Sequence, residues 1–516
     1  MDKTYLTAYD DAVALLKNLI ADKEHNSIGF FASSARKDNY KRLFARDAFW
    51  ICMADILTEE DMLIQGCRDS FGTLSKYQRE DGAIPSNVSP EGKVSYGIIN
   101  PRIDPTTLYI IGFTRFAKRH PQEGIVDKYF ESIKRAVAYL ENNWENKEYE
   151  FLYIPRAGNW ADEYLQQGFV LYDEVLWYIA LSEYADMLKM KGCKRQDIYR
   201  KKAERIKKNI RERFWIGNID YTRETIYSKI SEKFDFNSAG YFLHFYFSPR
   251  PEAASFQHPV GIFDAFGNIL AMLADIPTEE QVDKIVNFID EISQNKYPLV
   301  PAHYPFFPEE TFKSQKIHQY RFKEFVGHFH NGGLWAWYTG AYVAALVKAG
   351  REMKALKFLN GIIKANNEIK DGMNFYEYHT GARAKVDLEI VNSQGIDLYL
   401  SARIAELAKK ARSMVLVHYG KDPVDASSDM SLRALKIKSG DRIKITAVGP
   451  DSQEIVKKIA ELKEYDSTPF FKYEKLSIKN SRPGGAPYLG VSAAAYIIAY
   501  KAFFEKKILF EDVLTK

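Results

Sequence analysis

Residues 171–192 read LYDEVLWYIALSEYADMLKMKG. The apolar side chains of this stretch recur every three or four positions and fall on one stripe, formed by Trp177, Ala180, Leu181, Tyr184, Ala185 and Leu188. This spacing matches the 3.6-residue period of an amphipathic α-helix. Residues 195–214 follow at once with a second helical pattern, rich in Lys and Arg at its other positions. The two segments predict a pair of helices with a short connection.

The same arrangement repeats along most of the chain. Further helical pairs are predicted at 105–119 with 124–145, at 262–275 with 279–296, and at 332–350 with 351–367. Single helices are predicted at 8–24, 46–58, 60–79 and 490–506, which makes about twelve long helices in all. Long loops rich in aromatics, Gly and Pro separate the pairs at 80–104, 150–170 and 297–331. The fold class is therefore mainly α, with loops of a length that tends to be functional.

One segment departs from the helical pattern. Between residues 385 and 466, strand-like alternation, as in KVDLEIV at 385–391 and DRIKITAV at 441–448, is interleaved with short helical patterns. The predicted order is β-α-β-β-α-β-α, which describes a small α+β domain. We therefore expect a helical domain formed by 1–384 and 467–516, with an inserted domain at 385–466.

Composition narrows the class of protein. The 516 residues include 46% hydrophobic and 27% charged residues and have a formal net charge of +4, which excludes a disordered or collagen-like chain. This near balance gives no electrostatic reason to expect a nucleic-acid partner. No apolar run is long enough to span a membrane, and the first residues lack a signal-peptide pattern. Three separated cysteines indicate neither a zinc site nor a disulfide framework. We expect a soluble, cytoplasmic protein.

Three loop motifs place polar groups among aromatic rings. They are GNWADEY at 158–164, HFHNGGLWAW at 328–337 and NFYEYH at 374–379. A poorly solvated carboxyl group favours its protonated form, which suits a general acid. Each motif also has a structural interpretation: Asp162 as a helix cap, Glu377 as a surface acid, and Asn331 as part of a tight turn. His328 and His330 lack a third ligand nearby, so neither a metal site nor a cofactor is expected.

Seven stretches, taken in order, resemble the six-hairpin (α/α)6-barrel glycoside hydrolases, especially those of the glycogen-debranching, amylo-α-1,6-glucosidase type and the neutral/alkaline invertases. They are LFARD at 43–47, QREDGAIP at 78–85, DPTTLY at 104–109, WAD at 160–162, FDAFGN at 263–268, HNGGLW at 330–335 and YEY at 376–378. The resemblance covers the chain outside the insertion and implies a toroid of six helical hairpins.

The resemblance also implies an inverting mechanism. Asp162 would act as the general acid that protonates the leaving oxygen, and Glu377 as the general base that activates water. Glu163 is the alternative acid. The remaining residues implied in substrate binding are Arg46, Asp47, Asp104, Trp160, Asp264, His330, Asn331, Trp335 and Tyr376, with Trp160, Trp335 and Tyr376 as stacking faces.

The insertion resembles HPr, the phosphocarrier of the sugar phosphotransferase system, an open-faced β-α-β-β-α-β-α sandwich. The resemblance rests on the strand at 385–391, on SSDMSL at 427–432 and on KSGDRIKI at 438–445. HPr proteins carry a phosphorylated histidine in G-I-H-A-R-P, but here the stretch 395–400 reads GIDLYL. Asp397 replaces the histidine, so no phosphoacceptor is expected, and Asp397 is predicted to cap a helix. Ser428 stands where some HPr proteins carry a regulatory serine, and its phosphorylation is a hypothesis.

These observations predict an inverting glycoside hydrolase acting on α-glucosidic bonds of the glycogen or oligosaccharide type, with a non-phosphorelay HPr-like domain at the active-site rim. One alternative is a carbohydrate-binding or regulatory protein that uses the HPr-like domain to contact a protein partner or a second copy of itself. The other is an invertase-like sucrose hydrolase, although the invertase loop usually reads D-W-x-D where this chain has Asn159 before Trp160. We expect a carbohydrate ligand and neither a nucleic-acid nor a membrane partner. The sugar, the linkage and the oligomeric state are not readable from the sequence.

Overall fold

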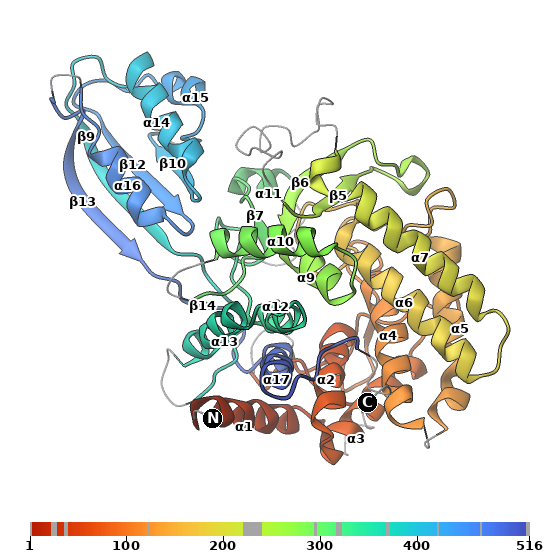
Figure 1. Cartoon of the computed structure of the whole chain (residues 1–516). Coiled ribbons are helices and arrows are strands. Elements are labelled where there is room, and N and C mark those ends of the chain that lie inside the picture. The colour runs from red at the N-terminus through yellow and green to blue at the C-terminus, as the bar shows by residue number, and fades with distance from the viewer. Residues whose placement is uncertain are drawn as a thin grey trace.

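The computed structural model of the chain is shown in Figure 1. It describes residues 3–21, 28–35, 40–121, 124–219, 240–293, 297–315, 322–367, 372–420, 423–464 and 467–511. Two separate hydrophobic cores are present in this part of the chain, a large one in the helical body and a smaller one in the insertion.

Six helices form a closed inner ring. They are α2 (Ala45–Thr58), α4 (Asp104–Arg119), α6 (Leu171–Met190), α9 (Ala265–Leu273), α12 (Ala336–Lys348) and α17 (Gly490–Glu505). Each packs against the next in this order, and α17 closes the ring on α2. Inner helices are apolar on nearly every side because neighbours surround them, and in α17 every residue from Gly490 to Ala502 is buried.

Six further helices of the described chain lie outside this ring. They are α1 (Lys3–Asn18), α3 (Asp61–Lys76), α5 (Ile125–Asn143), α7 (Gln196–Arg213), α10 (Glu279–Ile292) and α13 (Glu352–Asn366), and each alternates along the sequence with an inner helix. Outer helices bury one stripe only. In α10 the stripe includes Ile285, Ile289 and Ile292, and a capping box of Thr278 and Gln281 fixes the start of the helix. The prediction of a mainly helical chain is confirmed.

Short strands precede several inner helices and gather at one end of the ring. A three-stranded sheet contains β1 (Leu43–Phe44), β2 (Asn87–Val88) and β3 (Val94–Ser95). An antiparallel four-stranded sheet contains β4 (Gly168–Val170), β5 (Leu243–Phe247), β6 (Pro259–Asp264) and β7 (His303–Tyr304). Strands β1, β4 and β6 run directly into α2, α6 and α9. Loops that follow or precede these strands are therefore brought together over the N-terminal ends of the inner helices.

One helix boundary differs from the sequence prediction. A helix was expected over 262–275, but residues up to Asp264 form β6, which pairs with β5 and β7. Helix α9 begins only at Ala265, where the Asp264 side chain accepts a hydrogen bond from the Phe266 backbone amide. Pairing with the neighbouring strands and this cap override the apolar helical pattern. The remaining short elements are α11 (Glu309–Gln315), Ile216–Asn218 and Pro251–Ala253.

The inserted unit is built on one antiparallel sheet. Its elements are β9 (Arg383–Ile390), α14 (Leu398–Lys410), β10 (Met414–His418), β11 (Val424–Asp425), α15 (Asp429–Ala434), β12 (Arg442–Val448), α16 (Ser452–Ala460) and β13 (Phe471–Lys479). The strand order is β11-β10-β12-β9-β13. The predicted sequence of elements is present, followed by one more strand, β13, beyond the expected end at residue 466, which itself lies outside the described residues. We propose 383–479 as the extent of this domain.

Two antiparallel connections join the insertion to the helical body. Strand β8 (Tyr378–His379) leads out and pairs with β14 (Pro483–Gly484) on the way back. At the junction, Met414 and Val448 of the insertion pack into the main core. The Tyr304 hydroxyl also donates to the carbonyl oxygen of Arg412 at 2.8 Å. Within the described residues, no helix is long and apolar enough to cross a membrane.

Candidate functional site

A cavity of about 700 Å³ opens where the strands and loops meet at the end of the helical ring. Its walls come from segments far apart in the sequence. They include Tyr40, Arg42, Phe44, Arg46, Asp47, Arg102, Trp160, Asp162, Glu163, Lys323, Phe329, His330, Trp335, Trp337 and Glu377. This size suits one or a few sugar rings, and the mixture of aromatic, acidic and basic groups suits a polar ligand.

Asp162 lies in the cavity wall and forms an ion pair with Arg102. Arg102 also donates to the Ser86 hydroxyl at 2.9 Å, which fixes its guanidinium. The loop around Asp162 is held by Asn159, whose amide donates to Asp173 at 2.6 Å and whose oxygen accepts from the Ala161 backbone amide at 3.1 Å. Asp162 is therefore presented to the cavity with a cation already beside it.

Glu377 lies at the base of the connection to the insertion. Its Oε1 accepts a hydrogen bond from the Tyr40 hydroxyl at 2.8 Å, and its Oε2 accepts one from the Ala486 backbone amide at 3.0 Å. The Glu377 amide in turn donates to the Ala486 carbonyl at 2.9 Å. Gly485 adopts φ +71°, and a Cβ there would come within 2.0 Å of Glu377 Oε2. Both connecting segments thus position this carboxylate.

A second group of charges lies at the start of α2. Arg46 donates through Nε to Asp104 Oδ2 at 2.9 Å, and its Nη2 lies 2.8 Å from the same oxygen. Burial raises the pKa of Asp104, and Arg46 opposes that rise. Asp47 lines the cavity, and burial raises its pKa to about 7, against the charge of Arg46. Asp104 therefore anchors Arg46 from behind, whereas Asp47 faces the cavity.

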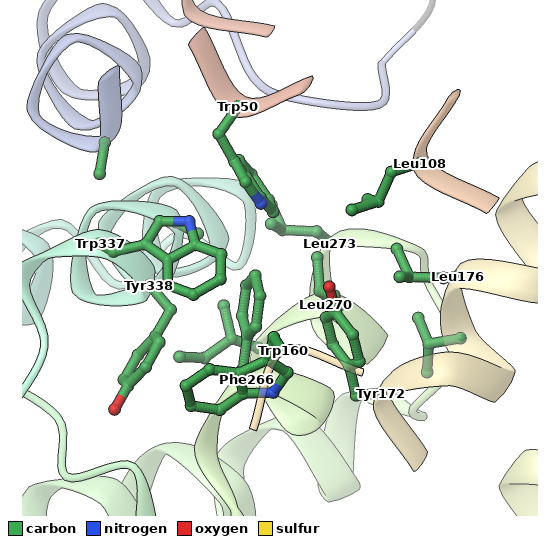
Figure 2. Packing of buried hydrophobic residues seen from close by; sticks show 14 of the residues in the cluster. Trp50, Leu108, Trp160, Tyr172, Leu176, Phe266, Leu270, Leu273, Trp337 and Tyr338 are labelled. Carbon is green, nitrogen blue, oxygen red and sulfur yellow. The ribbon is translucent and has the colours of Figure 1, made fainter. Parts of the chain in front are cut away.

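Aromatic rings form the floor of the site. Figure 2 shows Trp160 beside the rings of Phe266, Trp337 and Tyr338, whereas Trp50 contacts Phe266 and Trp337. The Trp160 ring meets Phe266 and Trp337 edge to face at 6.1 and 5.6 Å. Buried edge-to-face contacts of this kind fix ring orientation. Trp160 and the other lining rings thus give the cavity a rigid aromatic surface.

Trp335 and His330 form a second wall. Their rings are parallel within 2° with centroids 6.1 Å apart, and the Trp335 indole donates to the Phe329 carbonyl at 3.1 Å. Burial lowers the pKa of His330 well below its usual value, so the ring is neutral. A neutral imidazole and an indole face offer hydrogen bonding and stacking to a sugar without adding charge.

Glu324 is a buried acid that the sequence interpretation missed. Its Oε1 lies 2.9 Å from His330 Nδ1, and its Oε2 accepts from the Asn331 backbone amide at 2.8 Å. Burial raises the pKa of Glu324 well above its usual value, and the nearby charge of Glu163 adds to the rise. The residue sits in a long loop between Phe322 and Phe325, so it shares the pattern of an acid among aromatics, but it lies outside the three motifs quoted above. Its position becomes evident only when the loop folds back on His330.

Several residues implied in substrate binding lie away from the cavity wall. Asn331 uses its side chain to hold the loop, donating to the Phe307 carbonyl at 2.9 Å and accepting from the Phe307 amide at 2.9 Å. Asp264 caps α9, and its Oδ1 lies 3.8 Å from His303 Nε2. Tyr376 is half-buried, and its ring meets His379 rather than the cavity. Among the lining residues, the cavity thus brings together Arg46, Asp47, Trp160, Asp162, His330, Trp335 and Glu377, but not Asp104, Asp264, Asn331 or Tyr376.

The insertion uses its motif residues as helix caps. Asp397 Oδ1 accepts from the Leu400 amide at 2.8 Å at the start of α14. Ser428 Oγ accepts from the Ser431 amide at 3.2 Å at the start of α15. In the part of the chain that the structure describes, no group of three or more His, Cys, Asp or Glu side chains is arranged to hold a metal ion.

Two sequence families match parts of the chain. Residues 147–387 match the alkaline and neutral invertase family, and residues 384–464 match the PTS HPr component phosphorylation site family. The first match includes the loops of Asp162 and Glu377, and the second coincides with most of the insertion. No curated protein matches the sequence.

Solved structures with a similar fold include glycosidases. A bacterial glucoamylase complexed with acarbose matches with a TM-score of 0.51 at 14% identity, over 97% of this chain and 56% of that one. The chain therefore spans little more than half of that relative. A wild-type glycosidase matches with a TM-score of 0.47 at 12% identity over 71% of this chain and 86% of that one. A rhamnosidase from Klebsiella oxytoca with rhamnose bound gives 0.48 at 12% identity, over 73% and 58%.

The closed ring of paired helices, the glucoamylase match and the HPr family match define a six-hairpin glycosidase-like fold with an HPr-like domain. The resemblance seen in the sequence is thereby confirmed. The family match over residues 147–387 points to the alkaline and neutral invertases.

Proposed function

We propose that this protein is an inverting glycoside hydrolase acting on α-glucosidic bonds of the glycogen or oligosaccharide type, built on an (α/α)6 toroid. The observation that supports this most is the cavity itself. Asp162 and Glu377 come from loops more than 200 residues apart and line one cavity together with Trp160 and Trp335. Two carboxyl groups and aromatic faces are the parts that glycoside hydrolysis needs.

In this mechanism Asp162 donates a proton to the glycosidic oxygen as the bond to the anomeric carbon breaks. Glu377 accepts a proton from a water molecule that attacks the opposite face of the sugar. Tyr40 and the Ala486 amide, which both donate to Glu377, favour its ionised form and suit it to act as a base. In this proposal Asp47, Arg46 and His330, which line the same cavity, bind sugar hydroxyls.

The ion pair of Asp162 with Arg102 sets a condition on this mechanism. A general acid must present a carboxyl oxygen to the glycosidic oxygen, and in the structure Arg102 engages Asp162 Oδ2. The bound sugar must therefore separate Arg102 from Asp162, or the acid must be Glu163, which is buried and lines the same cavity. After proton transfer, Arg102 would stabilise the carboxylate that forms.

Substitutions test the assignment. Asp162→Asn and Glu377→Gln should each lower kcat by about 10³-fold or more, because each removes the group proposed to perform its proton transfer. Glu163→Gln is the matched control beside Asp162 and should keep most of the activity. Activity would be measured on a panel of α- and β-linked oligosaccharides, with the anomer of the product followed by NMR. Retained configuration, or full activity in either carboxylate variant, would refute the mechanism. Loss in Glu163→Gln with activity in Asp162→Asn would reassign the acid.

Sucrose hydrolysis is the second candidate function. The observation in its favour is the match of residues 147–387 to the alkaline and neutral invertases. Sucrose therefore belongs in the same panel, where preferential turnover of sucrose would decide for it. Binding of oligosaccharides without turnover of any panel member would instead support a carbohydrate-binding or regulatory protein.

We further propose that the HPr-like domain does not relay phosphate and contacts a protein partner or a second copy of the chain. Asp397 occupies the position of the phosphorylated histidine and caps α14. Incubation with the phosphotransferase enzyme that loads HPr should therefore leave the mass of the protein unchanged. Incubation with a serine kinase of the same system tests Ser428 separately, and an unchanged mass would end that hypothesis.

A further inference from the structure

One face of the inserted sheet is strongly basic. On β9, the buried side chains of Ala384, Val386, Leu388 and Ile390 belong to the core beneath α14 and α16. Because side chains alternate along a strand, the residues between them lie on the opposite face. We call this opposite face the basic face. Its cationic members are Arg383, Lys385, Arg442, Lys444, Lys472, Lys475 and Lys479.

The register of the sheet explains how these charges gather. Arg442 and Lys472 lie on either side of Glu389, and Lys444 and Lys475 lie on either side of Asp387. Directly paired residues in antiparallel strands share a face, so each central acid is flanked by two cations. Lys472 Nζ is 3.7 Å from Glu389 Oε2. With Asp425 of β11 included, the described sheet presents seven Lys and Arg and three acids on this face.

This surplus is a property of the insertion and not of the whole chain. Residues 383–479 contain eighteen Lys and Arg and fourteen Asp and Glu, a net charge of +4. The complete sequence also has a net charge of +4, so the rest of the chain is balanced. A local surplus of one sign on an exposed face raises the local concentration of ligands of the opposite sign.

The basic face leads toward the cavity. At the end of the face that includes Arg383, the side chains of Met414, Leu416 and Val448 pack against the core of the helical body. Arg383 of the face and Arg482 of the returning connection both act on His328, whose pKa burial and these charges lower to about 4. The next residues along the chain, Phe329 and His330, line the cavity. A ligand lying along the basic face would therefore reach the rim of the site.

We propose that the basic face binds a polyanionic carbohydrate chain, one bearing carboxylate, sulfate or phosphate groups. The choice of carbohydrate rests on the proposed function, since the face adjoins a cavity suited to sugars. Its composition disfavours a nucleic acid: no Phe, Tyr or Trp lies on this face in the described parts of β9, β10, β12 and β13. Single-stranded nucleic acids are bound largely by stacking on such rings.

Binding to dextran sulfate, with uncharged dextran as reference, tests the proposal in the full chain. Wild-type protein should bind dextran sulfate and not dextran, and should bind more weakly as salt is raised, because salt screens exposed charges. The first test variant is the triple substitution Lys444→Thr, Lys475→Thr, Lys479→Thr, which keeps good strand formers. It should bind dextran sulfate at least about tenfold more weakly than the wild type. The matched control Lys409→Gln, Lys410→Gln, Lys457→Gln removes three charges from α14 and α16 and should bind as the wild type.

Equal weakening in both triple variants would overturn the proposal, because it would show only an effect of net charge. So would tighter binding of a single-stranded oligonucleotide than of dextran sulfate at the same salt concentration. If circular dichroism shows the first variant to be unfolded, the single substitution Lys475→Thr replaces it, with Lys457→Gln as control. Binding is also measured on Asp162→Asn. This variant leaves the basic face intact and should bind dextran sulfate as the wild type does. Binding by the basic face is therefore tested separately from hydrolysis.

Discussion

The cavity is the expected reactive site of the helical body, and the N-terminal end of α14 is the expected reactive site of the insertion. In the cavity, the acids implied by the sequence, Asp162 and Glu377, are both present and face the same space. At α14, the helix, its cap and the surrounding sheet are present, but Asp397 stands where a nucleophilic histidine would be needed. A fold can thus persist after its reactive group is gone, because packing and capping maintain it without that group. Substitutions at matched features of the two regions test this difference.

The first pair of substitutions concerns two glycines with positive φ. Gly485 has φ +71°, and a Cβ would meet Glu377 Oε2 at 2.0 Å, whereas Gly440 in the insertion has φ +85° and nothing within 4 Å. Gly485→Ala must displace the carboxylate, and misplacement of a reacting group by about 1 Å costs on the order of 10²-fold in rate. Gly440→Ala should keep activity and cost about 1–2 kcal/mol of backbone strain. Steady-state kinetics and urea unfolding separate the two, and unchanged kcat in Gly485→Ala would contradict the placement of Glu377.

Two tyrosine hydroxyls provide the second pair. Tyr40 donates to Glu377 at 2.8 Å in the cavity, and Tyr419 donates to Asp441 at 2.7 Å on the surface of the insertion. Tyr40→Phe should lower kcat/KM tenfold to about a hundredfold, the range for a hydrogen bond to a charged group. The carboxylate would also lose a donor that favours its ionised form, so the acidic limb of the pH profile should move to higher pH.

Tyr419→Phe is the control for this pair and should leave both the rate and the pH profile unchanged. A role of Tyr40 in packing alone would lower stability without moving the acidic limb. The pH profile of kcat/KM therefore decides between positioning of the base and simple support of the fold.

The third prediction concerns Asp264, which was expected to bind substrate but lies beneath the site as the cap of α9. Burial raises its pKa to about 7, and burial also lowers the pKa of neighbouring His303 to about 3, so the imidazole supplies no charge to hold an ionised Asp264. The folded protein therefore binds this proton more tightly than the unfolded chain. The contribution of Asp264 to the free energy of unfolding is therefore greatest below about pH 4. It falls as the pH rises to about 7 and stays constant at higher pH.

Asp264→Asn can still cap the helix but cannot ionise. The unfolding free energy of the variant relative to wild type should therefore rise between pH 4 and pH 7 by an amount on the order of 4 kcal/mol. Urea unfolding at several pH values measures this difference. Other buried acids, such as Asp55, titrate in both proteins and cancel. Parallel stability curves would contradict the buried position, and a large rise in KM with unchanged stability would return Asp264 to substrate binding.

Local patterns predict elements whose causes are local. The 3.6-residue period locates the helix pairs, and alternation locates β9 and β12, because each signal arises from one buried face. Strand β13 was not expected, since its register shifts at a bulge between Tyr473 and Lys475 and interrupts the alternation. Tyr376 shows the converse: the family resemblance implied a stacking face, but the fold turns the ring toward His379.

Contacts between distant segments are what a single sequence cannot supply. Tyr40 is 337 residues from Glu377, and the Ala486 amide reaches the same carboxylate across the whole insertion. Glu324 lies only six residues from His330 and between Phe322 and Phe325, but these neighbours do not show that its buried side chain turns toward His330. The acids of the site could be proposed from their motifs, whereas the groups that orient them required the folded chain.

The smallest expected effect is at Asp397, and it tests most directly whether the N-terminal end of α14 differs from the cavity in lacking a reactive group. If this residue is only a cap, Asp397→Ala should cost about 1 kcal/mol, felt locally as faster amide hydrogen exchange in the first turn of α14. Asp397→Ser keeps a side-chain acceptor and should restore most of the protection. Hydrolysis should be unaffected in both variants, because α14 packs in the separate core of the insertion. A loss of activity in Asp397→Ala that Asp397→Ser does not rescue would instead show that this carboxylate serves the reaction, and that the insertion retains chemistry of its own.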